Sequence, residues 1–222
     1  MTSFTPRERK LVARLRTPQQ VQSYLNRLPY NYERHGGTLR TFRGVVQHGQ
    51  AHCLEAALFA AVVLEQHGYP PRVISFESID KLDHVIYVYQ ENGRWGSIAR
   101  SRDPGLHGRL PVFRSARALA ASYVDPYVDF TGRVLGFAVV DLAKEMHGYD
   151  WRLSARSVWK VERMLIDYPH ARLGMTDARY RRLLARYRAF RTANNDRKPV
   201  RYYARRDRWT PLPADRTWEG TI

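Results

Sequence analysis

The residues best suited to chemistry in this sequence are Cys53, its only cysteine, and His84, which follows 31 residues later. A thiol attacks a carbonyl carbon as its thiolate, and a helix N-terminus favours that charge because unpaired backbone N–H groups point toward it. Polar residues give way to a long apolar run at Cys53, which predicts that the cysteine begins a buried helix. A nucleophile also needs a base, and His84 opens a predicted strand. The pair indicates nucleophilic cysteine chemistry.

Two further residues are candidates for supporting roles. An acyl-transfer site needs donors for the oxyanion of the tetrahedral intermediate and a group that fixes the tautomer of the base. Gln47, six residues before the cysteine, can reach the oxyanion, as can the backbone N–H of Cys53. Asp103 is the candidate orienting group for His84.

Each of these four residues also has an ordinary structural interpretation. A cysteine that enters an apolar helix is often a small buried hydrophobe, and a histidine in a strand often only packs. Asp103 lies in an Arg-Asp-Pro-Gly segment, where an aspartate caps its own turn. Gln47 reads equally well as a solvated loop side chain.

The elements that must position these residues follow from capping signals and periodicity. Thr17 to Gln20 form a capping box with proline at the first helical position, which predicts a helix over 18–28. Residues 34–52 are rich in glycine and polar side chains and predict a loop. Residues 53–67 predict a central buried helix that stops at Gly68.

Strands are predicted next, over 71–79, 84–90 and 94–100, with Asn92 and Gly93 as a hairpin turn. This register places His84 opposite Ser101 and close to Asp103. Residues 103–111 predict a loop and 113–123 a helix, whereas 132–142 fit either a strand or a helix. From about Trp151 the chain reads as helical, with an apolar stripe on a strongly basic final helix.

Residues 44–101 contain two motifs, HCLEAALFAAVVLEQHGYPPRV and DHVIYVYQENGRWGSIARS. Together they resemble the transglutaminase-like superfamily, in which a cysteine begins a buried helix and a histidine opens a hairpin that contains an aromatic residue such as Trp95. The resemblance implies an α+β, papain-like fold whose buried helix carries Cys53 and packs on an antiparallel sheet. It also implies acyl transfer at an amide or isopeptide bond through a thioester, as in peptidases, amidases and transglutaminases. Cys53 would be the nucleophile and His84 the base, and Gln47 resembles the oxyanion glutamine of papain-like enzymes by its spacing.

The sequence departs from the family pattern at the third member of the triad. The family usually places an aspartate about four residues after the hairpin aromatic, and Ala99 stands at that position. Asp103 lies four residues further on, and Ser97 and Ser101 are the other polar side chains near His84. The third group therefore stays open between Asp103, Ser101 and none.

Composition limits the setting of this chemistry. A chain of 222 residues with 44% apolar and 26% charged residues is typical of globular proteins. We expect a transglutaminase-like domain over 1–150, with its motif core at about 44–103, and a basic helical extension over 151–222 packed on it. One cysteine, no apolar secretory segment and no long apolar run predict a cytoplasmic protein without a membrane span. His48, His52 and Cys53 invite a metal interpretation, but the missing ligands favour two solvated histidines, and no metal or cofactor is expected.

The net charge of +16 is concentrated near the C-terminus, where residues 151–208 contain 17 Lys and Arg but 5 Asp and Glu. Such a surface attracts polyanions, either nucleic acid or an acidic partner, although arginine-rich helices are often only solvated. Two functions are therefore predicted. One is an enzyme whose partner is a protein or peptide-like amide substrate, and the other is a non-catalytic transglutaminase-like module that binds through the basic surface.

Overall fold

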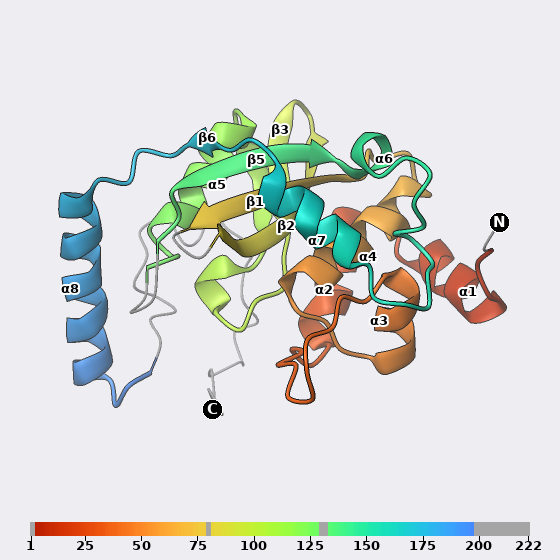
Figure 1. The fold of residues 1–222 in the computed structure, drawn as a ribbon, viewed down its shortest axis with the longest axis horizontal. Helices are drawn as coiled ribbons and strands as arrows, with labels where there is room; N and C mark the ends of the chain where they lie inside the picture. The colour runs from red at the N-terminus through yellow and green to blue at the C-terminus, as the bar shows by residue number, and fades with distance from the viewer. Residues whose placement is uncertain (1–2, 79–80, 129–132, 198–222) are drawn as a thin grey trace.

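The computed structural model describes residues 3–78, 81–128 and 133–197 (Figure 1). Within these ranges the chain forms a six-stranded antiparallel sheet of order β4-β3-β2-β1-β5-β6, with helices packed against it, which confirms the α+β class. In chain order the elements are α1 (Pro6–Arg14), α2 (Pro18–Arg27), α3 (Phe42–His48), α4 (Cys53–Glu65), β1 (Arg72–Ser78), β2 (Lys81–Glu91), β3 (Arg94–Ile98), η1 (Pro104–Leu106), β4 (Arg109–Phe113), α5 (Ala116–Val124), β5 (Gly136–Asp141), α6 (Leu142–Glu145), α7 (Trp159–Asp167), β6 (Ala171–Arg172) and α8 (Asp177–Ala193).

The predicted helix over 18–28 is confirmed as α2, and its capping box is formed as expected. The Thr17 hydroxyl accepts the Gln20 backbone N–H at 3.3 Å, and the Gln20 side chain accepts the Thr17 N–H at 3.1 Å. The same device begins α1, where Thr5 and Glu8 exchange both hydrogen bonds. Both helices therefore start where a side chain satisfies backbone donors that a helix leaves unpaired.

The predicted loop over 34–52 is partly wrong because it contains the short helix α3. Gly44 lies inside this helix, and the loop was predicted because glycine is typical of turns. Its lack of a side chain has a packing reason, since a Cβ on Gly44 would lie 2.8 Å from Cβ of Arg40. The stem of Arg40 therefore lies directly over the backbone of α3, and Gly49, at φ 66°, ends the helix.

The helix that carries the cysteine is the centre of the molecule. Every residue of α4 from Leu54 to Leu64 is buried, including Glu55, and the helix packs against β2, α2 and α3. A helix that is apolar all round belongs in a core, so the predicted central helix is confirmed. Gly68, at φ 84°, follows its C-terminus.

The predicted strands form β1, β2 and β3, and the hairpin has the predicted register. Asn92 and Gly93 have φ of 50° and 70°, as a two-residue type I′ turn requires, and Tyr87 pairs with Ile98. The strand β3 ends at Ile98, so the register does not extend to His84 and the expected pairing with Ser101 is wrong. The predicted loop over 103–111 also hides part of β4, an edge strand that tolerates Pro111.

The two faces of the sheet pack into separate cores, as alternation along a strand requires. Val73 and Val85 belong to the core formed with α4, whereas Ile74 and Ile86 belong to the core formed with α5. The ambiguous segment over 132–142 contains β5 and begins α6. Buried residues from 151 onward enter both cores: Trp151, Leu153, Val158, Val161 and Leu165 in the first, and Leu173, Met175 and Leu183 in the second.

The last described helix, α8, stands at the opposite end of the molecule from α1 to α4 (Figure 1). It buries Leu183 and Tyr187, while Leu184 and Phe190 of the predicted stripe are half-buried. Among the described helices, none combines the length and apolar character that crossing a membrane requires.

Candidate active site

Cys53 is the first residue of α4, so the predicted position of the thiol at a helix start is observed. The backbone of the N-cap residue, His52, is extended, and the chain turns into the helix at the cysteine. The thiol is free and partly exposed. The Cys53 backbone N–H has no partner within the helix, because the first N–H groups of any helix lack one.

His84 approaches this thiol from β2, close enough to lower the pKa of the thiol. The imidazole is buried, and its ring centroid lies 6.1 Å from that of Phe76 and 5.9 Å from that of Tyr123. Its Nε2 lies 3.0 Å from the Leu106 carbonyl oxygen. A carbonyl only accepts, so Nε2 carries a proton and Nδ1 is left for the thiol.

A second imidazole, that of His52, also lowers the pKa of the Cys53 thiol. Its Nε2 lies 3.0 Å from the Thr38 carbonyl oxygen, 3.6 Å from Oε1 of Glu55 and 3.9 Å from Oε1 of Glu33. The interpretation of His52 as a solvated loop histidine is therefore wrong, since its side chain is 12% exposed. The thiol lies between two imidazoles, which reach it from different elements.

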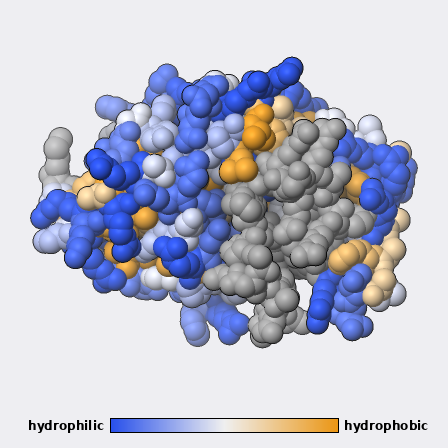
Figure 2. Space-filling model, turned by 180° about the vertical axis from the view of Figure 1, so that it is seen from behind, coloured by the Kyte–Doolittle hydropathy of each residue, from blue (hydrophilic) through white to orange (hydrophobic). Residues whose placement is uncertain are grey.

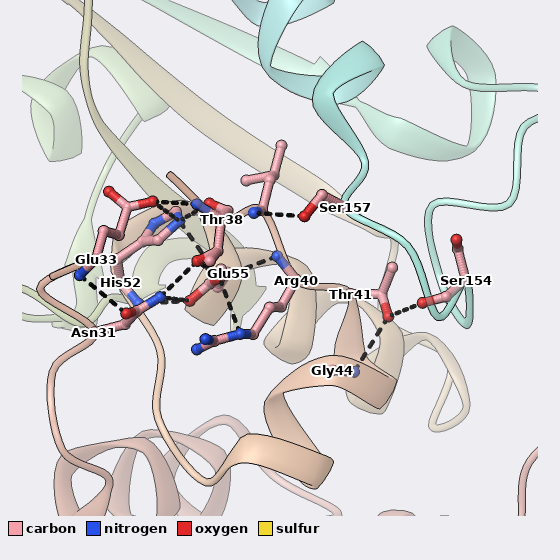
Figure 3. A network of polar contacts seen from close by, with 11 residues as sticks. Asn31, Glu33, Thr38, Arg40, Thr41, Gly44, His52, Glu55, Ser154 and Ser157 are labelled. Carbon is pink, nitrogen blue, oxygen red and sulfur yellow. Dashed lines mark hydrogen bonds and ion pairs between the residues drawn. The ribbon is translucent and has the colours of Figure 1, made fainter. Parts of the chain in front are cut away.

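Glu55 is the centre of the polar network behind His52 (Figure 3). This fully buried carboxylate accepts four hydrogen bonds, from the backbone N–H groups of Arg40 and His52 and from the side chains of Asn31 and Thr38, at distances of 2.9 to 3.0 Å. Buried carboxylates persist in proteins when hydrogen bonds and charges compensate them. The network therefore fixes the loop over 31–40 against the start of α4.

The two imidazoles and the thiol strongly affect each other's protonation. Burial raises the pKa of the Cys53 thiol, but hydrogen bonds from His52 and His84 and their charges outweigh it, and the pKa falls to about 5. Burial lowers the pKa of His52, whereas the hydrogen bond and charge of Cys53, then Glu55 and the Thr38 carbonyl, raise it to about 9. At neutral pH the site therefore holds a thiolate beside an imidazolium.

The Leu106 carbonyl that faces His84 belongs to a loop held by Arg109. This arginine is 1% exposed, and its guanidinium donates to the carbonyl oxygens of Gly105 and His107, each at 2.6 Å. The guanidinium also lies 4.0 Å from the ring centroid of Tyr123. A buried arginine thus holds the chain on both sides of Leu106.

The residues proposed from sequence to orient His84 have the following contacts. The Asp103 backbone N–H donates to Oγ of Ser101 at 3.0 Å, and the Asp103 carboxylate lies 3.8 Å from Nε of Arg102. Ala99, at the position of the expected aspartate, is fully buried and exchanges two hydrogen bonds of 2.9 Å with the Gln22 side chain. The group at the far nitrogen of His84 is a main-chain carbonyl, which no residue-type pattern can reveal.

Gln47 and His48 lie in the last turn of α3, and both are exposed. The structure therefore does not bring Gln47 into the group formed by Cys53, His52 and His84. Within the described ranges, no group of three or more His, Cys, Asp or Glu is arranged to hold a metal ion. Of the sequence candidates, Cys53 and His84 are brought together.

Sequence reasoning missed three acidic groups at this site, one of which is Glu33, 3.9 Å from Nε2 of His52. Glu55 had a local signal, because an N-cap residue followed by glutamate at the third helical position has the spacing of a capping box. Glu162 of α7 had none, since it comes from more than a hundred residues away. Burial raises its pKa, while the charge of His52 lowers it and those of Glu33 and Cys53 raise it, so α7 borders the site.

A cavity of about 330 Å³ is lined by residues of the loop over 30–40 and by Gln50. Thr38 and Glu33 line it and also face His52. Tyr30 lines it as well, and burial followed by the charge of Cys53 raises the pKa of this phenol. The cavity is of the size that holds a small substrate group.

A scan against protein-family models finds no match for the chain, and a search of curated proteins finds no relative. A thiolate, two imidazoles and the N–H groups of a helix start are parts that acyl transfer requires, and a cavity lies beside Glu33 and Thr38, which face His52.

Proposed function

We propose that this chain is a cysteine-dependent acyl-transfer enzyme that acts on an amide or isopeptide bond through a thioester. The observation that carries the proposal is the Cys53 thiol at the first residue of α4, beside the His84 imidazole of β2, which lowers the pKa of the thiol. The pKa of about 5 makes it a thiolate at neutral pH, and thiolate is the reactive form.

The proposed reaction uses one proton carrier. The Cys53 thiolate attacks the carbonyl carbon, an S–C bond forms, and the oxyanion lies at the start of α4, where the Cys53 backbone N–H can donate to it. The C–N bond then breaks as protonated His84 gives its Nδ1 proton to the leaving nitrogen. Water or an amine attacks the thioester and gives a proton to His84, and the thiolate leaves. The cycle restores thiolate and protonated His84, and the acyl group departs as an acid or a new amide.

Two features of the fold support this proposal. A buried helix begins with the cysteine and packs on an antiparallel sheet whose β2 carries the histidine, which is the arrangement that the transglutaminase-like and papain-like resemblance implies. The two strands that follow the helix in the chain, β1 and β2, are also hydrogen-bonded neighbours in this sheet. The Leu106 carbonyl takes the place at His84 that the family pattern gives to an aspartate.

Acylation by p-nitrophenyl acetate tests the proposal. The wild-type chain is expected to release one equivalent of p-nitrophenolate in a burst at pH 6, where an ordinary thiol is mostly protonated, and to gain the mass of one acetyl group. Cys53→Ser is the control and is expected to show neither, since this is the only cysteine. A wild-type chain that is folded but shows no burst and no acetyl adduct would contradict the proposal.

The basic helix α8 favours a second candidate function, binding of a polyanion. Six arginines lie along its 17 residues, with Asp177 as its only acidic residue. Arg181 and Arg182 are exposed on it. Seen from behind, the described surface of the molecule is mostly hydrophilic, with small apolar patches (Figure 2). An arginine-rich, water-facing helix suits sequence-independent binding to an anionic polymer.

Heparin chromatography tests this second function. The double variant Arg181→Glu and Arg182→Glu is expected to elute at clearly lower salt than the wild-type chain, because two cationic contacts become repulsive. The matched control places the same charge change on α1, as Arg7→Glu and Lys10→Glu, where both side chains are exposed. Equal elution of the two double variants would mean that net charge alone causes retention.

A further inference from the structure

The thiol has two histidines but the proposed reaction needs only one, so the role of His52 is open. Nε2 of His52 faces three oxygen atoms, the Thr38 carbonyl at 3.0 Å and the carboxylates of Glu55 at 3.6 Å and Glu33 at 3.9 Å. All three are acceptors, so Nε2 is protonated. The other ring nitrogen is the one left for the Cys53 thiol.

The surroundings of His52 favour its charged form. Glu55 is fully buried on the same helix, Glu33 comes from the loop over 31–40, and Glu162 comes from α7. Arg40 is the cation that opposes them, and its Nε lies 3.9 Å from Oε1 of Glu55. Three carboxylates and the thiolate of Cys53 therefore act on this imidazole, and opposite charges nearby stabilise an imidazolium.

His84 has different surroundings. Its Nε2 faces the neutral Leu106 carbonyl at 3.0 Å, and its ring lies against Phe76 and Tyr123. A carbonyl fixes the tautomer without adding the full negative charge that a carboxylate adds. The partner of His84 at Nε2 is therefore a neutral group, which suits a proton carrier in the proposed cycle.

We propose that His52 is a positioning residue that stays an imidazolium and holds the Cys53 thiolate, while His84 alone carries the proton of the reaction. In the family pattern a carboxylate orients the histidine that acts as the base. Here the carboxylate, Glu55, lies beside the other histidine, His52. The proposal deepens the proposed function and rests on it.

The pH profile of Cys53 alkylation by iodoacetamide tests the division between the histidines. His52→Gln keeps an N–H for the Thr38 carbonyl but removes the charge. We expect it to raise the midpoint of the profile by one pH unit or more, which makes the reaction about tenfold slower at pH 4, below both midpoints. His84→Gln is expected to raise the midpoint by less. His48→Gln, an exposed histidine at the end of α3, is the matched control and should leave the midpoint unchanged.

A His52→Gln midpoint equal to that of the wild-type chain would overturn the proposal, as would a larger shift in His84→Gln. If His52→Gln does not fold, imidazole nitrogen chemical shifts of the wild-type chain decide the point. Both nitrogens of His52 are expected to be protonated at pH 7, and a neutral His52 would overturn the proposal. These readouts are separate from acetylation by p-nitrophenyl acetate. A chain that forms no acetyl thioester but responds to His52→Gln would contradict the proposed function alone.

Discussion

With p-nitrophenyl acetate as substrate, His84→Ala is expected to keep the initial burst of p-nitrophenolate and then to turn over about a thousandfold more slowly. p-Nitrophenolate leaves without a proton, so acylation needs only the thiolate, which His52 still holds. Because this leaving group takes no proton, His84 first gives its proton to solvent. It is then the base that takes a proton from the water that releases the acetyl group. The measurement is the burst amplitude and the steady-state rate on one sample.

His67→Ala is the matched control for this prediction. His67 follows the other end of α4, where its Nε2 lies 2.9 Å from the Val12 carbonyl oxygen. We expect burst and steady-state rate to equal those of the wild-type chain. A His84→Ala chain that turns over normally would show that another group is the base. Loss of the burst as well would show that His84, and not His52, holds the thiolate.

Glu55→Gln is expected to lower the free energy of unfolding by about 3 kcal/mol, because one partner of a buried polar network is replaced by a group that cannot accept all its donors. Four donors point at the Glu55 carboxylate, and an amide nitrogen would face two of them with hydrogens of its own. The melting temperature is expected to fall by about 10 °C for a chain of this size. Urea unfolding and calorimetry measure both quantities.

Glu65→Gln provides the matched control on the same helix. Glu65 forms a two-bond ion pair with Arg152 at 2.6 and 2.7 Å, but both side chains are partly exposed. Exposed pairs of this kind contribute up to about 1 kcal/mol, so a much smaller loss is expected. Equal losses in the two variants would show that the network around Glu55 adds nothing beyond a surface ion pair.

The sequence predicted correctly those helices and turns that depend on residues close together in the chain. The capping box at Thr17, the all-apolar run after Cys53 and the turn at Asn92 and Gly93 each depend on neighbouring residues, and all three are formed. The helix α3 was missed because Gly44 reads as a turn, although Arg40 packs over it. The strand β4 was missed because Pro111 reads as a loop residue, although an edge strand accommodates it.

Part of the candidate site could likewise be predicted from sequence, and part could not. Cys53 and His84 could be paired from sequence because a helix start and a strand opening are both readable patterns. The partner of His84 could not, because it is the backbone carbonyl of Leu106, and any residue type provides a carbonyl. Gln47 shows the opposite error, since its spacing matched a pattern while its side chain is exposed on α3.

By itself the sequence determined the α+β class, the buried helix that begins at Cys53 and the hairpin that follows His84, because each depends on periodicity and turn chemistry within one segment. Only the tertiary structure decided what surrounds the thiol. His52 lies next to Cys53 in the chain, yet its imidazole also faces Glu33 and Thr38, and its charge acts on Glu162, and other segments bring these groups to it. Protonation is set by all the charges and hydrogen-bonding groups within a few ångströms, and that neighbourhood exists only once the chain has folded.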